Sequence, residues 1–202
     1  MPMKTTLGGA LRRLTPTRRR VGIAMVLTGV LAVLGGRLFA DSRQLDSLGP
    51  MPPLSGAVQW LNSPPLDREA LKGKVVLVDF WTYDCINCRR SLPHVNSWAK
   101  RYADQGLVVV GVHTPEYDYE NDIDNVREQV ARLGIEYPVA IDNRYAIWNA
   151  FANQFWPAHY FVDASGQVRY VHFGEGAYAE QEQVIQQLLA ERGHAPRPDA
   201  TE

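Results

Sequence analysis

Both cysteines of this chain lie in one Cys85-Ile-Asn-Cys88 motif, which follows an apolar run from Val75 to Trp81. Two thiols at this spacing, at the start of a helix, can close into a small disulfide ring and reopen on a second protein. The motif therefore predicts thiol–disulfide exchange. Two cysteines in 202 residues are too few for a framework of structural disulfides.

The two thiols are expected to play different parts. Cys85 falls at the helix N-terminus, where free backbone N–H groups and the helix dipole favour a thiolate, so it should attack the partner. Arg89 and Arg90 would strengthen this effect, whereas Asp84 would oppose it. Cys88, one turn later, should attack the mixed disulfide and release the partner.

A zinc half-site, a haem attachment and an inert disulfide are the alternatives for this motif. Zinc normally needs four ligands, but the five histidines are scattered and form no His-x-x-x-His pair. Haem attachment needs a histidine directly after the second cysteine, where this chain has Arg89. An inert disulfide would close too short a loop to stabilise much. We therefore expect a redox pair, with no metal and no cofactor.

The first 40 residues have the pattern of a signal peptide or a membrane anchor. A basic region precedes an apolar run of 16 residues, Val21 to Gly36, and no acidic residue occurs before Asp41. The run is short for a spanning helix of about 20 residues, but it continues past Arg37 as Leu38 to Ala40. Cleavage after Ala40 and retention as an anchor both stay open. Either would place the following domain in the periplasm or on the extracytoplasmic face of a bacterial inner membrane.

Composition predicts a single folded domain between two appendages. Pro and Gly in residues 41–57 indicate a linker, residues 58–192 a domain, and the Pro-rich segment 193–202 a disordered tail. A hydrophobic content of 46% is enough for a core, and a net charge of −1 gives no argument for nucleic-acid binding.

Strands and helices alternate along the domain and then end in a hairpin and a helix. The run 75–81 is apolar throughout, which is typical of a strand covered on both faces. Strands are expected at 58–61, 75–81, 107–112, 139–141, 158–162 and 168–173, and helices at 88–102, 124–133, 145–151 and 179–192. The order predicts an α/β fold with a mixed central sheet and helices on both faces.

These features resemble thioredoxin-fold proteins of the TlpA type, and most closely the DipZ-like branch of that family. The resemblance covers about residues 58–189 and implies a thioredoxin-like fold with an inserted helix in about residues 115–138. It is carried by four segments: Phe80–Cys88, Gly111–Glu116, Ala140–Asn143 and Trp156–Phe161.

The resemblance implies roles for three further residues. Asp79 stands where thioredoxins keep a buried acid, and it would accept a proton from the resolving thiol; an acid bonded to backbone is the alternative. Pro93 matches their helix-bending proline. Pro157 matches their cis-proline, beside which the backbone of a partner can pair as an added strand. Ile86-Asn87 replaces the usual Gly-Pro between the cysteines, which leaves the redox potential open.

Several other residues are candidates for the surroundings of the site. Trp81 and Trp156 are expected to form an apolar docking surface for the partner, or else to lie in the core. Glu116 and His159 would face the site, the alternative being a surface or core position. The acidic run Glu116–Asp124 is either a solvated loop, a partner-selecting rim or a weak cation site.

The resemblance implies an exported or tethered oxidoreductase that reduces protein disulfides, for example in cytochrome c maturation or periplasmic thiol maintenance. It implies protein thiols and disulfides as partners and a membrane electron donor of the DsbD/CcdA type; we expect a monomer. A disulfide-forming oxidase of the same fold stays open, because direction depends on redox potentials. A non-catalytic binding module stays open too. So does a thiol peroxidase, because Thr82-Tyr-Asp-Cys85 matches the Thr-x-x-Cys of peroxiredoxins, although Val78 stands where they have proline.

Overall fold

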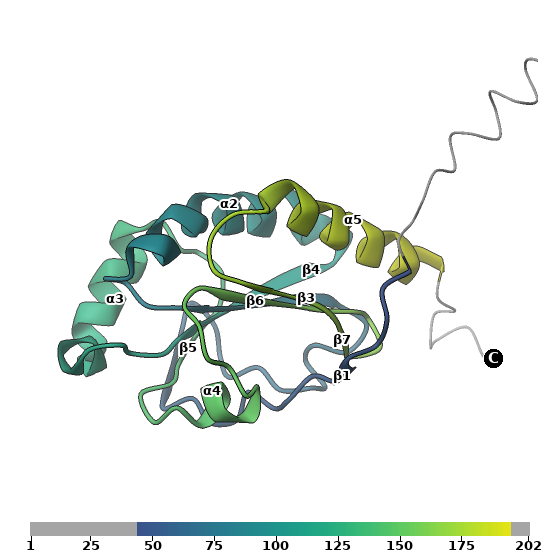
Figure 1. Ribbon diagram of the computed structural model, residues 1–202. Coiled ribbons are helices and arrows are strands. Elements are labelled where there is room, and N and C mark those ends of the chain that lie inside the picture. Colours follow the sequence, from purple (N-terminus) through teal and green to yellow (C-terminus); the bar gives the residue numbers. More distant parts are fainter. Residues whose placement is uncertain (1–43, 195–202) are drawn as a thin grey trace, which may run out of the picture. The chain divides into compact units, whose positions relative to one another are not determined.

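A computed structural model describes residues 44–194 and shows a mixed sheet with helices on both faces (Figure 1). The strands are β1 (Gly49–Pro50), β2 (Gln59–Leu61), β3 (Val75–Trp81), β4 (Leu107–His113), β5 (Val139–Ile141), β6 (Ala158–Val162) and β7 (Gln167–Phe173). The helices are α2 (Ile86–Tyr102), α3 (Ile123–Arg132), α4 (Ala146–Ala150) and α5 (Tyr178–His194), with 3-10 turns η1 (Ala103–Gln105) and η2 (Asp118–Asn121). The predicted α/β class is confirmed.

The described strands are arranged in the order β1-β7-β6-β3-β4-β5-β2. Strand β4 runs parallel to both β3 and β5, and the remaining pairs are antiparallel. Strand β3 therefore lies in the middle of the sheet, between parallel β4 and antiparallel β6. The loop that carries Cys85 leaves the carboxyl end of this central strand, which is where α/β sheets commonly place their ligands.

Side chains of β3 divide between two cores, because successive residues of a strand point to opposite faces. Leu77 and Trp81 join the core under α2, α3 and α5. Val78 and Phe80 join the second core, on the face that α4 and residues 51–71 cover. All seven residues of β3 are buried, as expected from their unbroken apolar run.

The segment between β4 and β5 holds η2 and α3, as the family resemblance implied. Asp122 begins α3, and its carboxylate accepts hydrogen bonds from the backbone N–H groups of Asp124 and Asn125. This is the usual N-cap arrangement, in which a side-chain oxygen satisfies free N–H groups of the first turn.

The structure differs from the expected linker, because residues 44–57 are packed against the domain. Strand β1 pairs with β7 at the edge of the sheet, where a proline is tolerated, and the backbone N–H groups of Leu48 and Met51 on either side of the strand donate to β7 and the turn before it. Leu45, Met51 and Leu54 are buried. The predicted signal or anchor, the start of the linker and the tail from residue 195 lie outside the described residues. Within 44–194, no helix is long and apolar enough to cross a membrane.

Candidate active site

Cys85 and Cys88 occupy the first turn of α2 as free thiols. Cys85 is partly exposed and serves as the N-cap of the helix, since its sulfur accepts a hydrogen bond from the backbone N–H of Cys88 at 3.3 Å. Cys88 is only 1% exposed. A partner can therefore reach Cys85, and it cannot reach Cys88 without first meeting Cys85.

The two sulfurs have opposite acidities. The hydrogen bond from the Cys88 thiol lowers the pKa of Cys85 to about 7, helped by the backbone N–H groups of Cys88 and Asn87 and opposed by burial and by the charge of Glu116. Burial raises the pKa of Cys88 far above the ordinary range, and the nearby Cys85 and the charge of Asp79 act in the same direction. Near neutral pH, Cys85 is the nucleophile, and Cys88 needs a base.

Asp79 lies beneath this pair and is 1% exposed. The hydroxyl of Tyr137 donates to Asp79 Oδ2 over 3.4 Å. Nε2 of His159 lies 3.2 Å from Asp79 Oδ1, although the angle is not that of a hydrogen bond and Nε2 has no other partner. Both neighbours of this carboxylate are side chains that can themselves titrate.

His159 is fully buried, so the structure removes a surface position from the alternatives considered for it. Residue 159 is opposite Asp79 in the antiparallel β3–β6 pair, and the two side chains therefore share the face that α2 and α5 cover. On its other side, His159 Nδ1 lies 2.6 Å from Oε1 of Gln181 in α5. No sequence pattern predicts this contact with Gln181.

The Trp156–Pro157 peptide bond is cis, as the resemblance implied. Pro157 is buried, and its carbonyl accepts a hydrogen bond from the backbone N–H of Gly174 at 2.8 Å. Trp156 is partly buried; its indole N–H donates to the carbonyl of Thr114 at 3.0 Å, and its ring lies 4.1 Å from that of Trp148. The indole is thereby fixed in place while part of it remains exposed.

Trp81 does not form a docking surface, and that prediction was wrong. Its side chain is 0% exposed, because it is on the face of β3 that points into the core under α2. Its ring lies 5.1 Å from that of His113. A Cβ atom on Gly111 would come within 3.0 Å of the indole nitrogen, so the tryptophan fits against a position that has no side chain.

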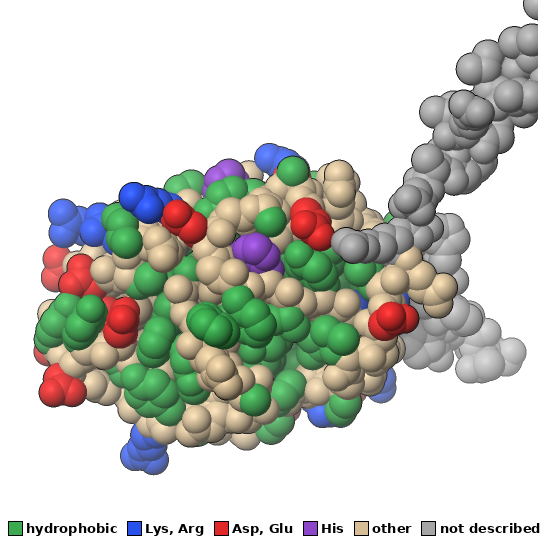
Figure 2. Space-filling model, viewed as in Figure 1, with side chains coloured by type: hydrophobic (Ala, Val, Ile, Leu, Met, Phe, Trp, Pro, Cys, Tyr) green, Lys and Arg blue, Asp and Glu red, His purple; other side chains and the backbone are tan. Residues whose placement is uncertain are grey.

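The exposed apolar surface is formed by other residues. Ile86, the residue after Cys85, is 57% exposed, and Phe155 and Phe173 are 50% and 49% exposed. The rings of Phe155 and Phe173 lie 5.0 Å apart; Phe155 precedes the Trp156–Pro157 bond in the chain, and Phe173 is opposite Ala158 in the β6–β7 pair. Figure 2 shows hydrophobic side chains gathered on the face that carries β6, β7 and α4. The sequence missed these residues because no local pattern distinguishes an exposed phenylalanine from a core one.

The acidic run Glu116–Asp124 contains one residue that is not solvated. Glu120 is 0% exposed. Its Oε1 accepts hydrogen bonds from the Thr82 hydroxyl and from the Asp84 backbone N–H at 3.2 Å. Its Oε2 accepts from the backbone N–H groups of Glu116 at 2.7 Å and Tyr117 at 3.0 Å.

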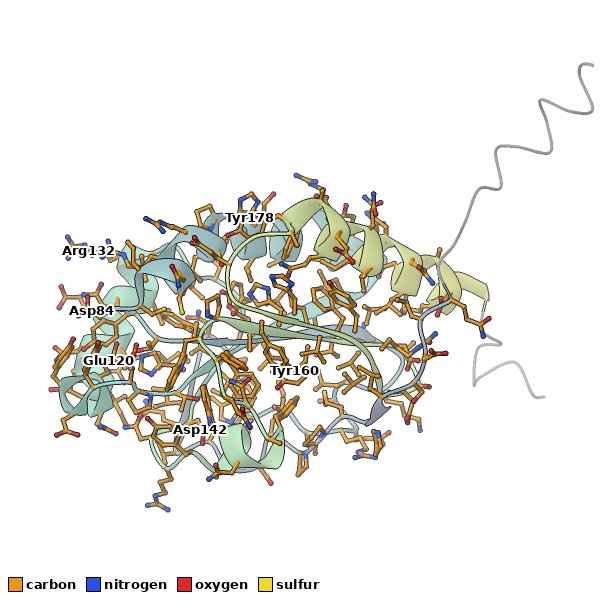
Figure 3. All side chains as sticks on the ribbon, in the orientation of Figure 1. Asp84, Glu120, Arg132, Asp142, Tyr160 and Tyr178 are labelled. Carbon is orange, nitrogen blue, oxygen red and sulfur yellow. The ribbon has the colours of Figure 1, made fainter. Side chains whose placement is uncertain are left out.

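Glu120 thus connects the inserted segment by hydrogen bonds to the loop that precedes Cys85. Figure 3 shows Asp84 and Glu120 at the same end of the sheet. The phenol of Tyr119 adds a second link, donating to Asp84 at 2.5 Å. No sequence signal singles out Glu120 among the acids of the run. Within residues 44–194, no group of His, Cys, Asp and Glu side chains is arranged to hold a metal ion.

The side chain of Thr82 is buried and contacts Glu120 and His113. Its hydroxyl bonds Glu120 and lies 3.3 Å from Nε2 of His113. Burial lowers the pKa of His113 to about 3, so this imidazole is neutral at physiological pH. The ring of Tyr83 stacks on it at 5.6 Å. The Thr-x-x-Cys pattern therefore reflects a structural contact of the threonine with Glu120.

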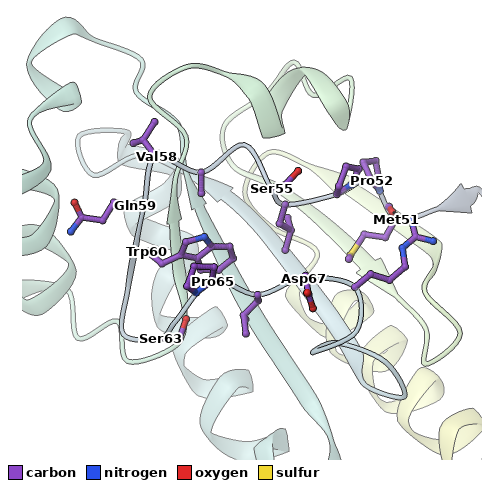
Figure 4. Close-up of a pocket in the computed structure, with 14 residues that line it drawn as sticks. Met51, Pro52, Ser55, Val58, Gln59, Trp60, Ser63, Pro65 and Asp67 are labelled. Atoms are coloured by element: carbon purple, nitrogen blue, oxygen red, sulfur yellow. Dashed lines mark hydrogen bonds between the residues drawn. The ribbon is translucent and has the colours of Figure 1, made fainter.

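An open pocket of about 530 Å³ lies on the other face of the sheet (Figure 4). Its walls come from residues 51–68 and include Met51, Leu54, Trp60 and Pro65. None of the residues around the cysteines lines it, so it is separate from the candidate active site.

Comparisons with known proteins agree with this geometry. The AhpC/TSA family model matches residues 61–171. Protein DipZ of Mycobacterium tuberculosis is 51% identical over 164 residues, covering 78% of this chain and 24% of its own length. The thiol-disulfide oxidoreductase YkuV of Bacillus subtilis is 34% identical over 142 residues, covering 70% of this chain and 95% of its own. The chain thus spans about a quarter of DipZ and nearly all of YkuV.

Solved structures show the same fold. A thioredoxin-like protein in its oxidized form, solved in solution, superimposes with a TM-score of 0.65 at 35% identity, covering 71% of this chain and 96% of that one. A putative thiol:disulfide interchange protein DsbE from Chlorobium tepidum superimposes with a TM-score of 0.61 at 26% identity, covering 74% and 100%.

Proposed function

Because this chain belongs to the AhpC/TSA family and has a thioredoxin-like fold with a free Cys85–Cys88 pair, we propose that it reduces protein disulfides outside the cytoplasm. It is a thiol–disulfide oxidoreductase of the TlpA type, DipZ-like branch. One observation carries the proposal: an accessible thiol with a pKa of about 7 lies directly above a buried thiol with a raised pKa. This difference in exposure and pKa between the two thiols suits an exchange in which Cys85 attacks the partner first and Cys88 then releases it.

In the first step, the Cys85 thiolate attacks one sulfur of a partner disulfide. A bond forms between Cys85 and that sulfur, and the other partner sulfur leaves as a thiolate that takes a proton from solvent. In the second step, Cys88 loses its proton to Asp79 and attacks Cys85. The Cys85–Cys88 bond forms, the bond between Cys85 and the partner sulfur breaks, and that sulfur leaves as a thiolate that takes a proton from solvent. Two electrons have then passed to the partner.

The partner would bind at the edge formed by Trp156 and Pro157. An extended segment next to this edge could pair with its backbone as an added strand. The exposed side chains of Ile86 and Phe155 are close in sequence to the cysteines and to this edge, and Phe173 lies near it because it pairs with Ala158 across β6 and β7; all three offer apolar contacts. Recognition through backbone and nonspecific apolar contacts would suit an enzyme that acts on unfolded or extended segments.

The location outside the cytoplasm is supported by the basic and apolar residues that precede Asp41. A reductant in that compartment must be recharged, and we assign this to a membrane electron donor of the DsbD/CcdA type. Cytochrome c maturation and the maintenance of periplasmic thiols are the processes that would use it.

A thiol peroxidase would require a hydroxyl that activates the peroxide next to Cys85. The hydroxyl of Thr82, the residue that matches the peroxidase pattern, is directed to Glu120. If the reduced protein consumes hydrogen peroxide in a fixed ratio to its Cys85–Cys88 pairs, the result would support peroxidase activity.

Two measurements test the proposal. Cys88→Ser should trap a mixed disulfide on Cys85, and Cys85→Ser should trap none; if neither variant traps a partner in cells, the assigned roles are wrong.

The reduction potential, found by equilibration with thiol–disulfide buffers, decides the direction of electron transfer. A value near −270 mV, about that of thioredoxin, supports a reductant, and one near −120 mV, about that of DsbA, indicates an oxidase.

A further inference from the structure

The outer edge of β7 is covered at one end and open at the other. Strand β1 pairs with β7 only through Val168 and Gln167. Within residues 44–194, the later part of β7, from Tyr170 to Phe173, pairs with β6 alone. An open sheet edge presents backbone N–H and C=O groups with which another extended chain can pair.

One hydrogen bond shows which residues of this edge face outward. The backbone N–H of Gly174 donates to the carbonyl of Pro157, so residue 174 faces β6. Successive residues of an antiparallel strand alternate in the direction of their backbone groups. The N–H and C=O groups of Phe173 and Val171 therefore point away from β6, and each residue offers one donor and one acceptor to an added strand.

The features that protect sheet edges are found only at the covered end of β7. Prolines, bulges and charged side chains discourage pairing with another chain. Pro50 lies in β1, the β6–β7 register shifts between Phe161 and Val162, and Arg169 follows the segment that β1 covers. The segment 170–173 contains no proline, acid, lysine or arginine. Burial lowers the pKa of its histidine, His172, so the open end is uncharged at neutral pH.

The side chains beside the open end are apolar. Val171 packs against the core on the α4 side of the sheet. On the same side, the ring of Phe173 lies 5.0 Å from that of Phe155 and 6.2 Å from that of Tyr160. Both phenylalanines are half exposed, and Figure 2 shows hydrophobic side chains gathered on this part of the surface. Every second side chain of an added strand would contact this surface, because alternate residues point to the same face.

The open end of β7 is at the same end of the sheet as the cysteines. Phe173 is opposite Ala158 in the β6–β7 pair, and Ala158 is opposite Phe80 in the β3–β6 pair. Phe80 precedes the loop that carries Cys85. Since neighbouring strands are about 4.8 Å apart, a strand added to β7 would lie about 14 Å from β3. An extended chain covers this distance with about five residues.

We propose that the open edge of β7, at Val171 and Phe173, binds an extended, apolar and uncharged segment of the substrate polypeptide as an added strand. The segment lies about five residues along the substrate from the disulfide that Cys85 attacks. This inference rests on the proposed function and names its substrate class: unfolded chains with apolar residues near a disulfide. The Trp156–Pro157 edge holds the residues next to the disulfide, and β7 holds the more distant segment.

Two peptides test the proposal on the reduced full-length protein. Each has one cysteine in a disulfide with nitrothiobenzoate, whose release is coloured, and a four-residue segment placed five residues to either side of the cysteine. The segments alternate valine and threonine in one peptide and glycine and serine in the other. KM should be about tenfold lower for the first peptide, because an added strand forms up to four hydrogen bonds that each contribute modestly in water.

Substitutions of Val171 show whether β7 is responsible for this difference. Val171→Lys adds a charge at the open edge, and Val171→Pro removes only an outward N–H; both should reduce the KM ratio of the two peptides to about one. Leu48→Lys is the matched control, because it adds the same charge at an exposed apolar residue beside the covered end, and it should keep the tenfold ratio. A ratio that stays at ten in both Val171 variants, or equal KM values in the unmodified protein, would overturn the proposal.

A small disulfide separates this inference from the proposed function. Dithiobis(nitrobenzoate) has no chain to pair with β7, so the unmodified protein and all three variants should reduce it at the same rate. Failure of the unmodified protein to reduce it would contradict the oxidoreductase itself. Failure of the Val171 variants alone would show that Val171 supports the active site, and would overturn its role in binding.

Sedimentation of the full-length protein tests the other occupant of this edge, a second copy of the chain. A dimer that Val171→Lys dissociates would show that β7 pairs with β7 of the second copy, and the proposal would be wrong. A monomer, or a dimer that the substitution leaves intact, is the expected result and leaves the edge available to substrate.

Discussion

Asp79 and Glu120 are both buried carboxylates beside the Cys-x-x-Cys motif, yet their surroundings differ in kind. Glu120 accepts four hydrogen bonds, three from backbone N–H groups and one from the hydroxyl of Thr82. Asp79 contacts the hydroxyl of Tyr137 at 3.4 Å and the imidazole of His159 at 3.2 Å. The first set of donors keeps its protons under all ordinary conditions, whereas an imidazole can give its proton up.

The difference shows that burial alone does not make an acid catalytic. A carboxylate has about four lone-pair sites, and at Glu120 donors with fixed protons occupy them, so the residue is suited to holding two segments together. Asp79 has fewer polar contacts, to the side chains of Tyr137 and His159, so part of its hydrogen-bonding capacity is unused. We infer that Glu120 is structural and that Asp79 moves protons.

The largest effect should come from removing Glu120. Glu120→Leu removes the acceptor of three part-buried backbone N–H groups and of the buried Thr82 hydroxyl, and we expect a loss of about 3 kcal/mol in the free energy of unfolding, measured by urea denaturation. Glu128→Leu, on the exposed side of α3, should change stability by less than about 0.5 kcal/mol. Equal stability of the two variants would remove the structural role of Glu120.

Asp79→Asn should act on the second step of exchange and less on stability. We expect resolution by Cys88 to slow about 100-fold, because the amide cannot accept the proton, while attack by Cys85 keeps its rate. Rapid mixing with a chromogenic disulfide measures the two steps separately. Tyr137→Phe, which removes only the phenol oxygen, should slow resolution less. If Asp79→Asn slows both steps alike, Asp79 is not the proton acceptor.

Glu116→Gln should have the smallest effect and should shift a pH profile. The pKa of Cys85 is lowered to about 7, so its alkylation rate should rise as pH increases through 7 and level off above it. The charge of Glu116 raises this pKa, and its removal should move the midpoint to lower pH. Glu128→Gln provides the control and should leave the midpoint in place; a shift to higher pH in Glu116→Gln would show that Glu116 acts in another way.

The strand, loop and helix start that carry the two cysteines can be predicted from the sequence. An apolar run followed by Cys-x-x-Cys predicts a central strand, a loop and a helix N-terminus, and these contacts lie within a few residues of one another. The exposed Cys85 and the buried Cys88 follow from that local geometry. The positions of Asp79 and Pro157 came from the family resemblance, and the structure shows the acid buried and the Trp156–Pro157 bond cis.

The side chains that surround the two cysteines depend on long-range packing. The β3–β6 register places His159 opposite Asp79, and α5 adds Gln181; these partners are far apart in the sequence, so no local pattern reveals them. Trp81 was expected in the docking surface, with the core as the alternative, and it lies in the core because the helix layer covers its face of β3. Glu120 is indistinguishable in sequence from its acidic neighbours, and only the folding of the insert against the loop before Cys85 buries it.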